Sequence, residues 1–104
     1  MMTTIIEENL GDIEALCRRH GVRRLAVFGS GVRGDFDAAK SDLDFLVEFA
    51  PMSPRDHKES YFLLIEGLEA LFSRSIDLVE LQAVKNPFVK TRIEMDQETV
   101  YDAA

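Results

Sequence analysis

Apolar residues recur at helical spacing in three parts of the chain and predict three helices. The first helix is expected from about Thr4 to His20, and the second from about Pro54 to Ser73. The third begins at Asn86 and Pro87, which read as a helix cap and a first helical position. Val100 is expected to supply a last apolar contact before the C-terminal tail.

Three shorter apolar segments predict strands. Residues 25–28 form a buried run that ends at a glycine, and residues 42–49 alternate between apolar and polar positions in the clearest period of the chain. Residues 76–81 form the third strand. The order helix, strand, strand, helix, strand, helix predicts an α+β (α/β) fold, in which a small mixed β-sheet is flanked by helices, and a single domain over residues 1–104.

Composition narrows the class of partner. The chain has 104 residues, 46% of them hydrophobic, which suffices for one modest core. Its net charge of −7 opposes non-specific attraction to nucleic acids and anionic membranes. We therefore expect no direct nucleic-acid binding and no membrane association, and a small ligand or a basic protein partner fits better.

Single residue types add little to this picture. Cys17 is the only cysteine, so an internal disulfide is excluded, and its place in a helical pattern predicts a buried, inert thiol. The first ten residues contain acids and no long apolar run, so we expect no signal peptide and a cytoplasmic location. His20 and His57 lie in polar stretches and are interpreted as isolated surface histidines.

Two acids on the second strand are the first candidate site. Asp42 and Asp44 are two residues apart, so both carboxylates point to the same face of a strand. Like charges this close repel unless a cation lies between them, and carboxylate oxygens suit magnesium. The alternative is that Ser41 and Asp42 form a turn, but this does not explain an aspartate inside the strand at position 44.

Asp77 interrupts the third apolar strand, and Glu80 competes with it as the functional acid there. If the second and third strands are neighbours, Asp77 completes a three-carboxylate cluster that can hold two magnesium ions. The alternative is an isolated, exposed aspartate.

A glycine-rich turn, residues 29–34, directly follows the first strand. Gly29 and Ser30 offer free backbone N–H groups and a hydroxyl to a phosphate, and Arg33 could neutralise phosphate charge. Taken alone, these residues are better explained by an ordinary turn and a solvent-facing arginine. The carboxylate pair on the next strand favours the phosphate interpretation, because a short connection brings the two together.

The run from Gly29 to Phe49, GSGVRGDFDAAKSDLDFLVEF, together with the later strand IDLV, resembles the minimal nucleotidyltransferases of the DNA polymerase beta superfamily. The resemblance covers nearly the whole chain and implies the nucleotidyltransferase fold, with ATP as substrate and two magnesium ions. It implies that Asp42, Asp44 and Asp77 are the catalytic metal ligands. The implied nucleotide-binding residues are Gly29, Ser30, Arg33 and Ser41.

The chain has almost nothing outside this core, so the acceptor must be another molecule. Small proteins of this kind resemble the antitoxins of two-component systems whose toxin is a HEPN-domain ribonuclease. The resemblance implies transfer of AMP to a tyrosine of that toxin within a hetero-oligomer. Two alternatives stay open: an antitoxin that neutralises its partner by binding without catalysis, and a nucleotidyltransferase with another acceptor.

Overall fold

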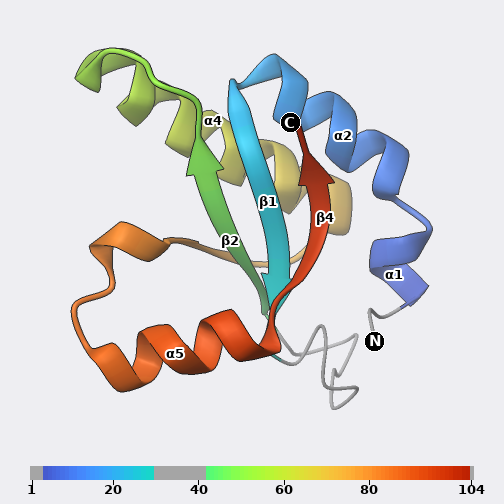
Figure 1. The fold of residues 1–104 in the computed structure, drawn as a ribbon. Coiled ribbons are helices and arrows are strands. Elements are labelled where there is room, and N and C mark those ends of the chain that lie inside the picture. Colours follow the sequence, from blue (N-terminus) through green and yellow to red (C-terminus); the bar gives the residue numbers. More distant parts are fainter. Residues whose placement is uncertain (1–3, 30–41, 104) are drawn as a thin grey trace.

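The computed structural model describes residues 4–29 and 42–103 as one four-stranded sheet with helices on both faces (Figure 1). The strand order is β3-β2-β1-β4, with β2 and β3 parallel and both pairings of β1 antiparallel. The prediction of a small mixed sheet flanked by helices is confirmed. The elements are α1 (Thr4–Glu7), α2 (Leu10–Arg19), β1 (Val22–Phe28), β2 (Leu43–Phe49), α4 (Pro54–Phe72), β3 (Ile76–Glu80), η1 (Leu81–Ala83), α5 (Pro87–Asp96) and β4 (Glu98–Asp102).

One face of the sheet forms the main core. Alternate residues of β1 and β2, such as Leu25 and Phe45, are fully buried there against Leu64 and Leu68 of α4. The Phe45 ring stacks on Phe72, with centroids 6.1 Å apart. Because side chains alternate along a strand, packing this set against α2 and α4 directs the intervening residues to the opposite face. That opposite face carries the acids.

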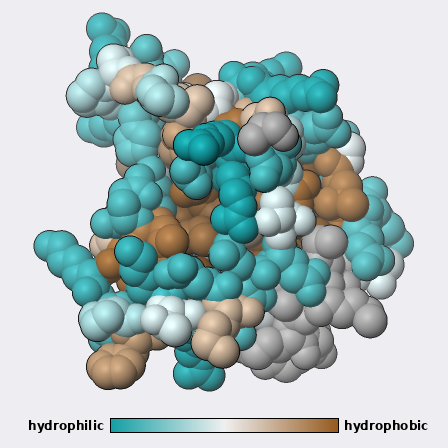
Figure 2. All heavy atoms as spheres, viewed as in Figure 1, coloured by the Kyte–Doolittle hydropathy of each residue, from teal (hydrophilic) through white to brown (hydrophobic). Residues whose placement is uncertain are grey.

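Among the described elements, α5 and the residues around η1 cover the second face, and they do so only in part (Figure 1). Ala26, Leu46 and Ile93 form a small separate core there. Figure 1 shows α5 crossing in front of one end of the sheet, whereas α2 and α4 lie behind it. In the same view, Figure 2 shows hydrophobic side chains gathered above α5 within a hydrophilic border. A partly covered face of this kind leaves room for a ligand beside α5.

The predicted helix over residues 4–20 is interrupted. α1 ends at Glu7 and α2 begins at Leu10. Asn9 separates them, and its side-chain amide donates a hydrogen bond of 2.8 Å to the Ile5 carbonyl. An asparagine side chain competes in this way with the helical backbone, so the apolar period continues while the helix does not.

Val100 packs against the main core as predicted, but the prediction of a tail was wrong, because Val100 lies in a fourth strand, β4. β4 pairs antiparallel with β1, with Leu25 opposite Tyr101 and Ala26 opposite Thr99. A segment of five residues is too short for its alternation of apolar and polar positions to distinguish a strand from an irregular tail. Only its pairing with β1 makes it a strand. No helix in the described ranges is long and apolar enough to cross a membrane.

Cys17 offers a test of the core. Its thiol is fully buried, and burial, with a smaller contribution from Glu14, raises its pKa to about 12 from an ordinary value of 9.0. We expect the native thiol to react with a disulfide reagent at pH 8 about a thousandfold more slowly than the unfolded chain, because the thiolate is scarce and inaccessible. Stopped-flow labelling with and without denaturant measures this ratio. Equal rates would contradict the packing.

Candidate active site

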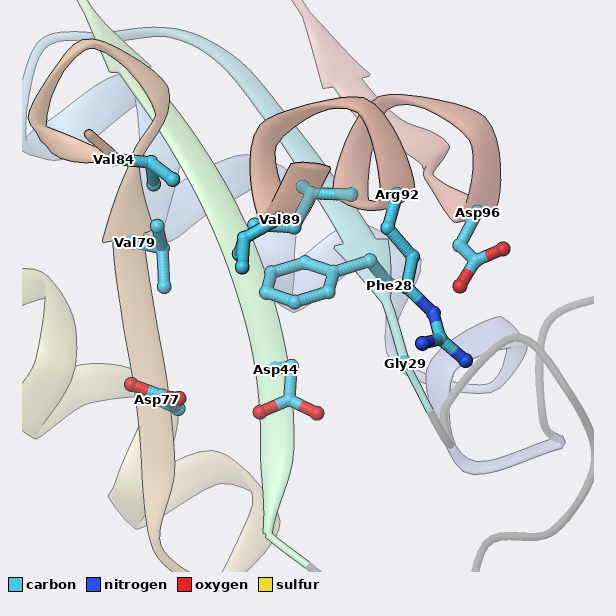
Figure 3. Close-up of a pocket in the computed structure, with 10 residues that line it drawn as sticks. Phe28, Gly29, Asp44, Asp77, Val79, Val84, Val89, Arg92 and Asp96 are labelled. Atoms are coloured by element: carbon cyan, nitrogen blue, oxygen red, sulfur yellow. The ribbon is translucent and has the colours of Figure 1, made fainter. Parts of the chain in front are cut away.

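Two of the predicted acids lie side by side on the partly covered face. Asp44 of β2 and Asp77 of β3 are direct partners in the parallel register, and Phe28 of β1 is the partner of Asp44 on the other side. Figure 3 shows the two carboxylates next to each other at the same end of the sheet. Since neighbouring strands are about 4.8 Å apart, both carboxylates can contact one small cation.

Gly29 shapes the floor beside Asp44. Its φ of +68° lies in the left-handed region, and a Cβ placed on it would stand 2.5 Å from Asp44 Oδ2. Real Cβ atoms do not approach an oxygen so closely. The chain therefore requires glycine here for two reasons, the backbone turn and the approach of the carboxylate. The sequence motif had indicated only the turn.

The position of Asp77 depends on contacts at the outer edge of β3. The Tyr61 hydroxyl of α4 donates a hydrogen bond of 2.5 Å to the carbonyl of Leu78, the next residue. Burial raises the pKa of Tyr61, and the nearby charges of Glu80 and Asp77 raise it further. A neutral hydroxyl is what this bond requires, so α4 holds the strand that carries Asp77.

His57 is not an isolated surface residue, contrary to the sequence interpretation. Its Nε2 lies 2.5 Å from Glu80 Oε1. Its ring packs edge-to-face against the Phe49 ring, with the two centroids 5.2 Å apart. Glu80, the competitor of Asp77, is thereby engaged with α4 and is absent from the lining of the pocket described below. His20 is half-buried, and its pKa is lowered by burial and by Arg19.

The acids open into a cavity of about 470 Å³ between the sheet and α5. α5 begins at a cap in which Asn86 Oδ1 accepts hydrogen bonds from the N–H groups of Phe88 and Val89, as the Asn-Pro sequence predicted. Helical spacing then aims one side of α5 at the cavity. The residues lining it are Phe28, Gly29, Asp44, Asp77, Val79, Val84, Val89, Arg92, Ile93 and Asp96.

Sequence reasoning missed most of the wall that α5 provides. Val89, Arg92, Ile93 and Asp96 all line the cavity, and none of them was singled out as a site residue from the sequence. Arg92, Ile93 and Asp96 follow Val89 by three, four and seven residues, a spacing that places all four on one face of a helix. The sequence did not indicate that this face covers the acids, because that depends on how the chain returns after β3.

The remaining predicted residues fall into two groups. Asp42 is exposed immediately before β2 and does not line the cavity, so its role as a metal ligand stays a prediction. Within residues 4–29 and 42–103, no group of three acid, histidine or cysteine side chains is close enough to hold a metal. Ser30, Arg33 and Ser41 lie outside the described residues.

The donor set nevertheless suits magnesium. Asp44 and Asp77 supply oxygen ligands only. Because Gly29 has no Cβ, the Asp44 carboxylate has room beside it. Magnesium commonly takes one or two carboxylates from the protein and completes its shell with water and phosphate oxygens. Two facing carboxylates in an open cavity meet that requirement.

Comparison with known proteins agrees with this geometry. Residues 13–99 match the family model described as a nucleotidyltransferase domain. A predicted protein adenylyltransferase of Methanocaldococcus jannaschii is 34% identical over 86% of this chain and 95% of its own length. A protein adenylyltransferase of Thermococcus cleftensis is 41% identical over 83% of this chain and 80% of its own.

Solved structures share the fold. A predicted minimal nucleotidyltransferase superposes with a TM-score of 0.71 and 29% identity, covering 94% of this chain and 95% of that one. The same fold also occurs in a complex of an MNT antitoxin with a tri-AMPylated HEPN toxin of Shewanella oneidensis. That match has a TM-score of 0.62 at 19% identity, covering 94% of this chain and 73% of the other. At that identity the likeness concerns the fold alone.

Proposed function

Because the chain belongs to the nucleotidyltransferase domain family, we propose that it is a magnesium-dependent enzyme that transfers AMP from ATP to a protein. The acceptor in this proposal is a tyrosine of a HEPN-domain ribonuclease toxin, and the modification makes the chain an antitoxin. The single observation that carries the proposal is the pairing of Asp44 with Asp77 beside Gly29. Like charges placed together at a cavity favour a bound cation.

Each residue has a distinct task in this reaction. Asp44 and Asp77, together with Asp42, would hold magnesium, which when bound neutralises phosphate charge and aligns the reacting groups. Gly29 and Ser30 would bind the triphosphate through backbone N–H groups, with Arg33 and Ser41 contributing further contacts. Asp77 would also orient the acceptor hydroxyl and take its proton. The hydroxyl oxygen bonds to the α-phosphorus, the bond to the bridging oxygen breaks, and pyrophosphate leaves.

The relatives support a protein acceptor. The two that are 34% and 41% identical are both named protein adenylyltransferases. The solved complex pairs a protein of the same fold with a HEPN toxin that carries AMP. The net charge of −7 suits docking on a basic, RNA-cleaving partner in the cytoplasm, where ATP is supplied.

Labelled ATP tests the proposal directly. The purified chain is incubated with magnesium, the product of the adjacent gene and ATP labelled at either the α- or the γ-phosphate. We expect label on the partner from α-labelled ATP only, because AMP is transferred and pyrophosphate released. Substituting the partner's tyrosines by phenylalanine one at a time then locates the acceptor.

The same experiment distinguishes the two other candidate functions. If the partner is inhibited equally with and without ATP, and no label is transferred, the chain neutralises by binding alone. If the partner stays unlabelled while another protein in a cell extract is labelled, the chemistry stands and the proposed acceptor is wrong.

A further inference from the structure

Arg92 is the only cation among the described residues that line the cavity, where the other charged residues are Asp44, Asp77 and Asp96. Figure 3 shows its side chain leaving α5 and reaching toward Gly29, with the guanidinium on that side of Asp44. Asp77, Val79 and Val84 lie at the opposite end. The cavity thus has one end beside Gly29 that carries Arg92 and Asp96, and an opposite end beside Asp77 that is lined by Val79 and Val84 (Figure 3).

The segment that leads up to Arg92 differs in charge from the whole chain, although Glu94 and Asp96 follow it within four residues. Residues 81–93 contain Lys85, Lys90 and Arg92 and no acid, although the full sequence has 19 acids against 12 lysines and arginines. A local cationic segment on an acidic protein attracts anions to one place. Of these three, only Arg92 lines the cavity.

We propose that Arg92 binds the β- and γ-phosphates of the donor and stabilises the pyrophosphate as it leaves. This inference rests on the proposed function. A planar guanidinium matches two phosphate oxygens at once, and its charge cannot be lost by deprotonation. Negative charge develops on the oxygen that bridges the α- and β-phosphates as its bond to the α-phosphorus breaks, and the Arg92 guanidinium at the Gly29 end of the cavity (Figure 3) would stabilise that charge.

The end of the cavity beside Asp77 is a poorer location for the triphosphate. Val79 and Val84 offer no hydrogen-bond donor from their side chains, and no cationic side chain of the described lining lies at that end (Figure 3). Placing the leaving group at Arg92 leaves Asp77 and the valines for the acceptor, with the α-phosphorus between them near Asp44. This division agrees with the in-line arrangement that phosphoryl transfer requires.

The test compares Arg92→Ala, Arg92→Lys and the control Lys90→Ala, which removes a cation from the same helix outside the cavity lining. Binding of magnesium pyrophosphate is measured by calorimetry, and AMP transfer is measured in parallel. We expect Arg92→Ala to weaken pyrophosphate binding about 10- to 100-fold and to raise the KM for ATP, Arg92→Lys to retain part of the affinity, and Lys90→Ala to stay within about twofold of wild type.

The outcomes separate this inference from the proposed function. Wild-type affinity for pyrophosphate in Arg92→Ala overturns the role of Arg92, as does a wild-type protein that does not bind pyrophosphate. An equal loss in Lys90→Ala also overturns it, because the effect would then be general electrostatics. If pyrophosphate binding depends on Arg92 but no AMP is transferred to any acceptor, the phosphate site stands and the proposed enzymatic function fails.

Discussion

Replacing Asp44 by asparagine is expected to reduce AMP transfer on the order of a thousandfold, the largest loss we expect from any single substitution. The amide keeps the shape of the side chain but removes the negative charge that pairs with Asp77 across β2 and β3. Without it the site loses its affinity for the cation that aligns the phosphates. Initial rates of label transfer to the partner measure the loss, and thermal unfolding checks that the fold persists.

Glu48→Gln is the matched control for this change. Glu48 lies on the same strand, four residues from Asp44 and directed to the same face by the strand period, but it is exposed, does not line the cavity and contacts Arg23 at 3.3 Å. An exposed ion pair contributes at most about 1 kcal/mol, so we expect nearly wild-type transfer. Equal losses in both variants would contradict a special role for Asp44.

Gly29→Ala is expected to lower both stability and transfer. The new Cβ would meet Asp44 Oδ2 at 2.5 Å, and the φ of +68° disfavours any residue with a Cβ. We expect a loss of about 1–2 kcal/mol in the free energy of unfolding from the backbone. Displacing the Asp44 carboxylate should slow transfer about a hundredfold, because small misplacements of reacting groups are costly.

Gly21→Ala separates these two effects. Gly21 has the same φ of +68°, but its added Cβ would meet only the flexible end of Met52, at 2.9 Å, far from the acids. We expect a similar loss of stability in urea titration and wild-type transfer at a temperature where both variants are folded. If Gly21→Ala loses as much activity as Gly29→Ala, the close contact with Asp44 is not what matters.

The part of the site that depends on residues adjacent in sequence could be predicted. An aspartate within an alternating strand is unusual enough to be noticed, and Asp44 needed no neighbour to be suspected. A glycine after a buried strand likewise indicated a tight turn at Gly29. The role of Asp77 could be predicted only on the condition that β2 and β3 are neighbours, and no local sequence pattern specifies that parallel pairing.

What the sequence could not indicate depends on contacts distant along the chain. β4 becomes a strand because β1 offers it an edge, and Arg92 enters the cavity because α5 folds back over the acids. The pairing of His57 with Glu80 joins residues 23 positions apart. Each of these is a tertiary relation, and a helical or strand period carries no information about it.

The central claim is that Asp44 and Asp77 act together as one site, and a double-mutant cycle tests it most directly. Transfer rates are measured for Asp44→Asn, Asp77→Asn and the double variant under identical magnesium and ATP concentrations. Residues that act as a unit lose their contribution when either is removed. We therefore expect a double variant no slower than the slower single variant. A double variant whose loss equals the product of the two single losses would show independent residues and contradict the account.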